Sequence, residues 1–217
     1  MITPKVFDIE TLNWVLPIAV GFYDGERYYE FIQANEADDV LWRFLEFLTQ
    51  YPGARLFAHN AADYDNKFIL DCLKRHDQKV KFAGGMGKLV WAENDISFED
   101  SYLMIGRGLN ACCQAFGVEQ KLHWDHSKTG KPWEMGDSLG EFKAYMKRDV
   151  LALSEVLDKF CRKVIDYFNI IPSATLSLTA VKAFDKNFYD VKKIEANEKL
   201  ENFISCLLYT SPSPRDS

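Results

Sequence analysis

Apolar positions follow a strand-like pattern in the first part of the chain and a helical spacing in much of the rest. Three short runs, at 6–10, 17–23 and 27–32, are rich in β-branched and aromatic residues, and Asp24-Gly25 separates the last two. They predict three strands, the last two forming a hairpin. Leucine and phenylalanine then recur at helical spacing over 41–48, and 54–58 returns to a strand pattern. The chain therefore begins antiparallel and continues as α/β.

Helical segments dominate the remainder. We expect a helix over about 65–75, a glycine-rich turn at 84–87 between two strand-like runs, and a strand ending at 98–101. Further helices are predicted at 109–116, about 139–167 and about 175–189. The order of these elements is typical of a ribonuclease H-like sheet. It consists of a strand that carries acids, a hairpin, a crossover helix and another strand that ends near an acid. The predicted fold class is therefore α/β: a ribonuclease H-like fold with a mixed β-sheet flanked by helices.

Composition narrows the class of protein. The chain has 217 residues, of which 47% are hydrophobic and 27% charged, and its net charge is −6. This is enough apolar material for a core, and no apolar run approaches the ~20 residues that span a bilayer. Its start lacks the basic and apolar regions of a secretory signal, and five cysteines without Cys-x-x-Cys spacing argue against a disulfide framework or zinc ribbon. We expect a globular protein of the cytoplasm, not secreted, with buried thiols.

The first candidate site residues, Asp8 and Glu10, lie two positions apart in the first predicted strand. Side chains at i and i+2 of a strand point to the same face, so the two carboxylates project together. The Asp-x-Glu pattern alone is weak, because it recurs in the predicted turn at 24–26. The first pair differs because Val6 and Phe7 precede it in an apolar strand, where two acids are costly unless a cation neutralises them.

Two more groups of candidate residues lie further along the chain. The run from His59 to Asp65 follows a predicted strand, at the edge of a sheet where functional side chains gather. The alternative is that Asn60 or Asp63 only caps the next helix, and we expect His59 to be structural. Tyr145 and Asp149 are one turn apart on one face of the long helix, in the only Tyr-x-x-x-Asp of the chain. For Asp149, the alternative is a surface position paired with nearby basic residues.

Taken together, these patterns resemble the three exonuclease motifs of family B DNA polymerases. Asp-x-Glu on a first strand, Asn-x-x-x-Tyr-Asp after a later strand and Tyr-x-x-x-Asp on a late helix agree in order, spacing and element type over residues 1–205. Three further stretches resemble the protein-primed branch of that family, found in phages and mobile elements: 100–105, 116–121 and 175–189. Three residues separate Asn60 from Tyr64, where that branch more often has two.

The resemblance implies a DEDDy-type 3′-5′ exodeoxyribonuclease that proofreads, releasing nucleoside 5′-monophosphates from single-stranded or frayed DNA. Two Mg²⁺ or Mn²⁺ ions, which favour hard oxygen ligands, would lie ~3.5 to 4 Å apart. By this matching their ligands would be Asp8, Glu10, Asp65 and Asp149, and Tyr145 would orient the attacking water. The frayed 3′ end would be held by Thr11, Asn60, Tyr64 and Ser101, with Lys121 near the scissile phosphate.

The same resemblance predicts the domain organisation and the partners. Residues 1–190 would form the exonuclease domain and 191–205 the start of the connection to a polymerase palm. The Asp-Thr-Asp and Asn-Ser-x-Tyr-Gly elements of the polymerase are absent, so we expect a fragment of a longer DNA-directed DNA polymerase that does not itself polymerise. Expected partners are a single-stranded DNA 3′ end, the polymerase domain in cis and a terminal protein primer; we expect a monomer and no membrane association. A net charge of −6 predicts weak binding to duplex DNA, which depends on Lys and Arg contacts.

Other interpretations stay open. A freestanding nuclease of the same fold is disfavoured by the polymerase-like stretch at 175–189. A catalytically silent module that binds nucleic acid or a terminal protein would be expected to have lost an acid, whereas all four are present. A generic cofactor-binding domain is disfavoured because no Gly-x-Gly-x-x-Gly opens a helix after a strand.

The end of the chain, 206–217, resembles one reading frame of a transposon adapter used in sequencing libraries. We therefore expect a disordered, non-native tail and a longer natural protein. Deleting 206–217 should leave the melting temperature unchanged in a thermal denaturation experiment, because a disordered tail adds nothing to the core. A drop of several degrees would contradict this interpretation.

Overall fold

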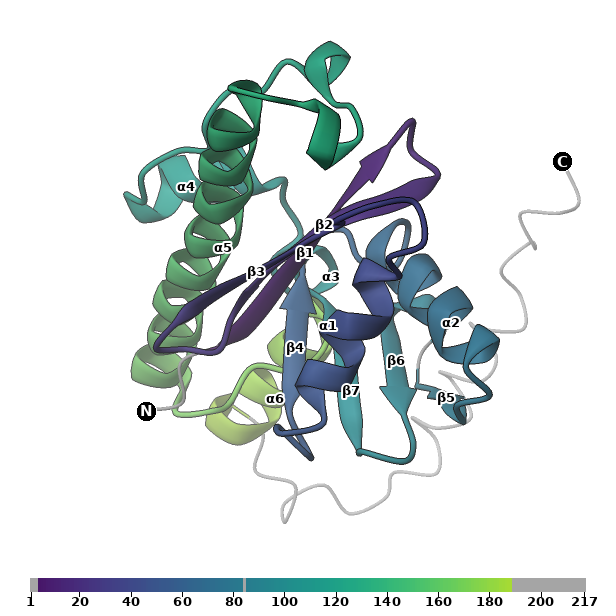
Figure 1. Cartoon of the computed structure of the whole chain (residues 1–217). Helices are drawn as coiled ribbons and strands as arrows, with labels where there is room; N and C mark the ends of the chain where they lie inside the picture. The colour runs from purple at the N-terminus through teal and green to yellow at the C-terminus, as the bar shows by residue number, and fades with distance from the viewer. Residues whose placement is uncertain (1–3, 84, 189–217) are drawn as a thin grey trace, which may run out of the picture.

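A seven-stranded mixed sheet forms the centre of the protein in the computed structural model, which describes residues 4–83 and 85–188 (Figure 1). Its strand order is β3-β2-β1-β4-β7-β6-β5. β4 runs parallel to β1 and β7, whereas the other neighbours are antiparallel. The strands are β1 (Lys5–Leu12), β2 (Leu16–Tyr23), β3 (Tyr28–Ile32), β4 (Arg55–Ala58), β5 (Val80–Phe82), β6 (Lys88–Trp91) and β7 (Ile96–Asp100). The predicted connection at 191–205 and the predicted tail lie outside the described residues.

Helices cover both faces of this sheet, as Figure 1 shows. One face carries α1 (Val40–Leu48) and α2 (Asp65–Arg75). The opposite face carries α3 (Ser101–Ile105), α4 (Leu109–Phe116) and α5 (Ser138–Phe168), and α6 (Leu176–Phe188) packs against α3 and α5. Short 3₁₀ turns complete the described chain: η1 (Gly85–Gly87), η2 (His126–Lys128) and η3 (Pro132–Glu134). In the described part of the chain, every helix is too short or too polar to cross a membrane.

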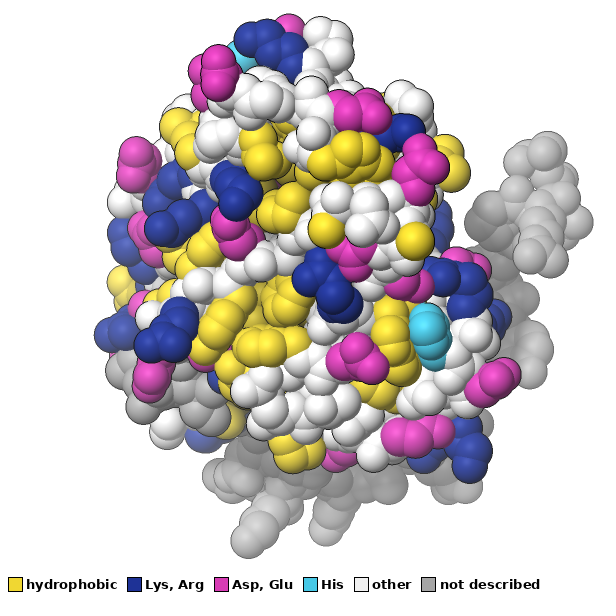
Figure 2. Space-filling model, in the orientation of Figure 1, with side chains coloured by type: hydrophobic (Ala, Val, Ile, Leu, Met, Phe, Trp, Pro, Cys, Tyr) yellow, Lys and Arg dark blue, Asp and Glu magenta, His cyan; other side chains and the backbone are white. Residues whose placement is uncertain are grey.

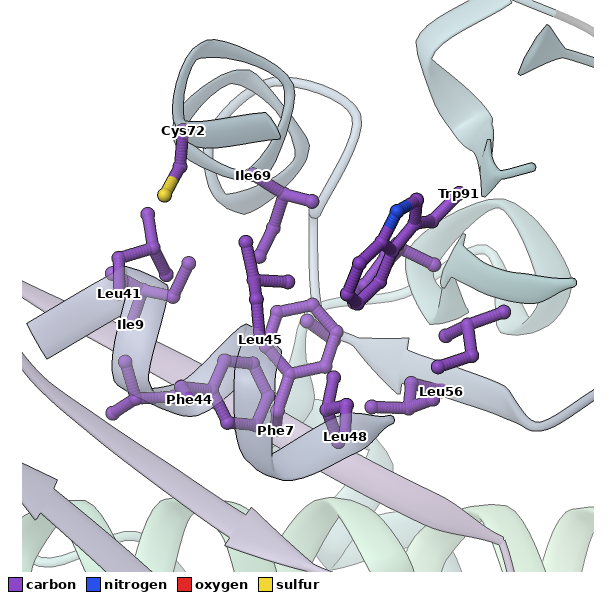
Figure 3. Packing of buried hydrophobic residues seen from close by; sticks show 14 of the residues in the cluster. Phe7, Ile9, Leu41, Phe44, Leu45, Leu48, Leu56, Ile69, Cys72 and Trp91 are labelled. Carbon is purple, nitrogen blue, oxygen red and sulfur yellow. The ribbon is translucent and has the colours of Figure 1, made fainter. Parts of the chain in front are cut away.

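Alternation along β1 divides its side chains between the two faces. Phe7 and Ile9 point toward α1 and α2 and pack among Phe44, Leu45 and Ile69 (Figure 3). Val6 belongs to the opposite core, beneath α5. Because strand side chains alternate with a period of two, Asp8 and Glu10 share the α5 face with Val6. The apolar residues that anchor β1 therefore decide which way its two acids point.

The predicted strands and helices are confirmed to within a residue or two, with one omission. The helix α3 follows β7 directly, and Asp100 caps it by accepting a hydrogen bond from the Tyr102 N–H, 2.8 Å away. A five-residue helix is too short to show a helical period. The expectation of buried thiols is confirmed for Cys72, Cys112 and Cys113, whereas Cys161 is partly exposed; these four are free, and Cys206 lies outside the described residues.

The outer surface over α1 and α2 carries charged side chains of both signs, interspersed with apolar ones (Figure 2). Several of these charges pair across elements. Arg43 binds Asp38 at 2.7 Å, and Arg75 binds Asp39 at 2.8 Å. Exposed pairs of this kind contribute little to stability, about 0 to 1 kcal/mol each. The fold is therefore held mainly by the two apolar layers against the sheet.

Gly21 in β2 allows α5 to lie unusually close to the sheet. It pairs with Asp8 across the β1–β2 ladder. A Cβ atom at this position would lie 3.0 Å from the Val150 Cγ2 and 3.1 Å from both the Met146 Cγ and the Tyr28 hydroxyl. Met146 and Val150 flank Asp149 on α5, so the absence of a side chain at Gly21 permits Asp149 to approach the acids of β1.

We expect Gly21→Ala to lower the free energy of unfolding by about 1–3 kcal/mol, because the added methyl group overpacks the contact with α5. Gly140→Ala is the matched control, since Gly140 lies in the first turn of α5 with open space around it. The control should be neutral or slightly stabilising, because alanine favours the helix. Urea denaturation of both variants measures the difference, and equal midpoints would contradict the proposed constraint.

Candidate functional site

Three carboxylates from two elements meet at the end of β1. Asp8 and Glu10 come from β1 and Asp149 comes from α5, and each offers an oxygen within 4.8 Å of the others. Glu10 and Asp149 are buried, and Asp8 is partly buried. All three line a cleft of about 350 Å³, together with Tyr145, which stands one helical turn before Asp149. The alternative of a surface Asp149 is thus wrong.

Asp65, the fourth predicted acid, lies beside Asp8 but has a different contact. It is 1% exposed, and its Oδ1 accepts a hydrogen bond from the backbone N–H of Ile9 at 3.1 Å. β1 pairs with β4 only at Lys5 and Val6, so the N–H of Ile9 lies beyond the paired part of that edge. Asp65 satisfies this N–H from the first turn of α2. The acid therefore joins β1 to α2 at the point where the strands separate.

The N-terminus of α2 lacks the side-chain cap that Asn60 or Asp63 could have provided. Tyr64 occupies the N-cap position, and no side chain caps the helix there. Asp63 is exposed, and Asn60 is exposed with a left-handed backbone at φ 63°. The alternative that Asn60 or Asp63 only caps this helix is therefore wrong. Asp65 is buried at the first helical position instead, where the helix dipole favours a negative charge.

Burial and the proximity of other carboxylates raise the pKa values of these acids. Burial, followed by the negative charge of Asp149, raises the pKa of Asp8 to about 6. Burial and the charge of Asp8 also raise the pKa values of Glu10 and Asp65 well above their ordinary range. Burial raises the pKa of Asp149, although Lys121 opposes the increase. Neutralising so many neighbouring carboxylates at neutral pH requires bound protons or a cation of high charge.

Lys121 supplies one positive charge to the cleft. Its Nζ forms an ion pair with the Asp149 Oδ2. Burial lowers the pKa of Lys121, but the carboxylates of Asp149, Asp8 and Glu10 outweigh this and raise it. Neither buried oxygen of Asp149 accepts a hydrogen bond of regular geometry. A set of oxygen donors with unsatisfied capacity and excess negative charge fits a hard divalent cation such as Mg²⁺ or Mn²⁺.

Tyr145 lies against two aromatic rings beside the carboxylates. Its ring is 6.3 Å from that of Trp124, nearly parallel, and 6.1 Å from that of His126, nearly perpendicular. Burial and the charges of Glu10, Asp149 and Asp8 raise the pKa of Tyr145. The hydroxyl group therefore stays protonated at neutral pH and can donate a hydrogen bond within the cleft.

The five predicted substrate-binding residues fall into two groups. Thr11, Tyr64 and Lys121 line the cleft, and the hydroxyl groups of Thr11 and Tyr64 are hydrogen-bonded to each other. Ser101 is completely buried; its Oγ donates to the Ala58 carbonyl at 3.0 Å and lies 3.0 Å from His59 Nδ1. Asn60 is exposed on the loop before α2. Ser101 and Asn60 are thus separate from the set of residues that line the cleft.

Besides Ile9, which lies between two candidates on β1, four cleft residues were not among the sequence candidates: Asn13, Trp14, His126 and Thr129. Asn13 and Trp14 form the turn between β1 and β2. His126 belongs to η2, in a stretch without a motif or a clear period. The tryptophan four residues after Glu10, directly after Asn13, was the available signal for the turn, whereas the place of His126 depends on tertiary structure.

Comparisons with known proteins bear on this site and fold. Residues 118–209 match the family described as DNA polymerase type B, organellar and viral. A probable DNA polymerase of Ascobolus immersus is 24% identical over 237 residues. Phi29 DNA polymerase complexed with primer-template DNA has a similar structure, with a TM-score of 0.63 at 16% identity. The same polymerase complexed with single-stranded DNA gives a TM-score of 0.61 at 16% identity.

These matches confirm the resemblance read from the motifs. The fold is α/β and ribonuclease H-like, and the chain is similar to family B DNA polymerases in sequence and to phi29 DNA polymerase in structure. The alignments cover 86% of the chain but 20% of the Ascobolus immersus protein, and 91% of the chain but 38% of phi29 DNA polymerase. The chain thus spans well under half the length of these relatives.

The raised pKa values predict a stability that depends on pH. Burial raises the pKa of Asp8 from 3.8 in the unfolded chain to about 6 in the folded protein. Below pH 3.8 the protonated carboxyl group makes its full contribution to stability, and this contribution is lost as the pH rises through about 6. We expect Asp8→Asn to raise the melting temperature of the metal-free protein at pH 7 by a few degrees, and much less near pH 4. Differential scanning calorimetry in EDTA at pH 7 and near pH 4 measures the two melting-temperature differences.

The exposed acid Asp63 provides the control, because Asp63→Asn leaves the cluster intact. Saturating Mn²⁺ should reverse the order, raising the melting temperature of the wild-type protein more than that of Asp8→Asn. A wild-type protein that melts higher than Asp8→Asn without metal at pH 7 would contradict the inferred repulsion.

Proposed function

We propose that this chain is the 3′-5′ exonuclease domain of a family B DNA polymerase and removes nucleotides from single-stranded or frayed DNA ends. The observation that carries the proposal is the convergence of Asp8, Glu10 and Asp149 on one cleft, with Tyr145 beside them. Carboxylates at this spacing are suited to divalent metal ions, and phosphodiester hydrolysis is a reaction that such ions promote. The similarity to DNA polymerases supports DNA as the substrate.

Each residue of the site has a role in this proposal. Asp8, Glu10 and Asp149 would hold the metal ions, and Asp65 would complete the set from beside Asp8. When bound, two divalent ions would activate a water molecule and stabilise the leaving 3′ oxygen. The protonated hydroxyl group of Tyr145 would orient that water by a hydrogen bond. Lys121, already paired with Asp149, would place a positive charge near the scissile phosphate.

The length of the relatives leads to a second part of the proposal. Because the chain spans 20% of one DNA polymerase and 38% of another, we propose that it acts in cis with a polymerase domain. That domain would supply the extended contacts with DNA, since Lys121 is the only Lys or Arg among the residues that line the described cleft. A terminal protein primer, as in the protein-primed branch, would bind the intact polymerase.

Digestion of a 5′-labelled single-stranded oligonucleotide with Mg²⁺ or Mn²⁺ tests the activity. We expect a ladder that shortens from the 3′ end and that EDTA abolishes. Asp8→Ala and Asp149→Ala should each abolish it because they remove metal ligands, whereas Tyr145→Phe should reduce the rate by about 100-fold.

Glu26→Ala is the matched control, because Glu26 belongs to the second Asp-x-Glu of the chain and is exposed on a turn. It should keep full activity. A folded wild-type protein that binds the oligonucleotide without shortening it would favour the catalytically silent module instead.

A further inference from the structure

The turn between β1 and β2 has an unusual residue at its tip. The Val15 N–H donates to the Leu12 carbonyl at 3.1 Å, and the two residues between them have positive φ: 53° for Asn13 and 62° for Trp14. This is the pattern of a type I′ turn, which favours Asn at its first central position and Gly at its second. A tryptophan at the second position is strained, because a bulky side chain disfavours positive φ.

Packing within the described protein offers little compensation for this strain. Trp14 is 69% exposed, so most of its indole surface remains in water. It contacts two rings: the Tyr64 ring edge-on, with the centroids 5.9 Å apart at 75°, and the His126 ring at a tilt of 37°, with the centroids 5.8 Å apart. Strained residues that the core does not require are concentrated at functional sites.

These three rings form an aromatic rim over the carboxylates. Trp14, Tyr64 and His126 come from the β1–β2 turn, the start of α2 and η2, and all line the cleft that holds Asp8, Glu10 and Asp149. The Tyr64 hydroxyl is anchored to Thr11, one residue after Glu10. The aromatic rim is therefore fixed relative to the acids of β1.

The chemistry of the cleft indicates what this rim binds. Among the residues that line it, Lys121 alone carries a permanent positive charge, and Asp149 already engages it. Phosphate contacts are thus few, whereas the exposed indole offers a flat surface. Aromatic side chains bind single strands by stacking on bases, which needs no particular base sequence.

We propose that Trp14 stacks on a base near the 3′ end of single-stranded DNA and thereby positions the strand over the carboxylates. This inference rests on the proposed function and adds a substrate-positioning residue to it. The strained turn is retained because glycine would relax the backbone but remove the stacking surface. Trp14 therefore lowers the stability of the fold and increases the affinity for single-stranded DNA.

The decisive variant is Trp14→Gly in the full chain. Relief of the positive φ should raise its melting temperature, so loss of binding cannot be attributed to unfolding. We expect its Kd for a fluorescein-labelled oligothymidylate, measured by fluorescence anisotropy in EDTA, to rise about tenfold. Trp14→Phe should retain most of the affinity.

Asn169→Gly is the matched control, since Asn169 is an exposed residue with φ 51° at the C-terminus of α5. It should also raise the melting temperature while leaving the Kd unchanged. A Trp14→Gly variant that binds as tightly as the wild type would overturn the proposal, and so would a wild-type Kd too weak to measure.

A substrate with abasic residues at its 3′ end separates stacking from other effects. In the nuclease assay, Trp14→Gly should raise the KM for a normal oligonucleotide and leave the KM for the abasic one unchanged, because no base is available to stack. An equal rise in KM for both substrates would overturn the proposed stacking by Trp14 but leave the nuclease function in place. If the wild type degrades neither substrate, the proposed nuclease function fails, while the anisotropy comparison still decides whether Trp14 stacks.

Discussion

The approach of α5 to the centre of the sheet is the contact on which the site depends. Asp149 reaches the acids of β1 because Gly21 leaves room for Met146 and Val150 on either side of it. The same contact encloses three carboxylates in a partly buried cleft, where burial raises their pKa values and, for Asp8 and Glu10, the charge of neighbouring carboxylates raises them further. Close packing and electrostatic repulsion therefore act against each other at one place. A divalent cation bound between the carboxylates would relieve the repulsion without loosening the packing.

Much of the fold followed from local pattern. Phe7 and Ile9 alternate with Asp8 and Glu10, so the period of the strand already separated an apolar face from an acidic one. The uncapped start of α2 followed less readily, because Asn60 and Asp63 both look like capping residues, yet Tyr64 occupies the position. The helix α3 was missed because five residues are too few to establish a period.

The spacing of the site residues was predictable from local geometry where they lie in regular elements. The spacing of Asp8 and Glu10, and of Tyr145 and Asp149, is set by strand and helix geometry and can be read from sequence. Ser101 shows the limit, since its place in a motif did not reveal that its hydroxyl group is buried against Ala58. Trp14 and His126 come together through tertiary structure alone, and no period connects them.

The fork between β1 and β4 determines where the site can form. These strands pair at only two positions, after which β4 ends at Ala58 and the first residue of α2, Asp65, contacts β1. The carboxylate of Asp65 then takes the place that a backbone carbonyl of β4 would occupy. A β4 extended by a few residues would pair with Ile9 and displace α2 from the edge of β1. The length of one short strand, more than any single acid, thus keeps an opening in an otherwise continuous sheet.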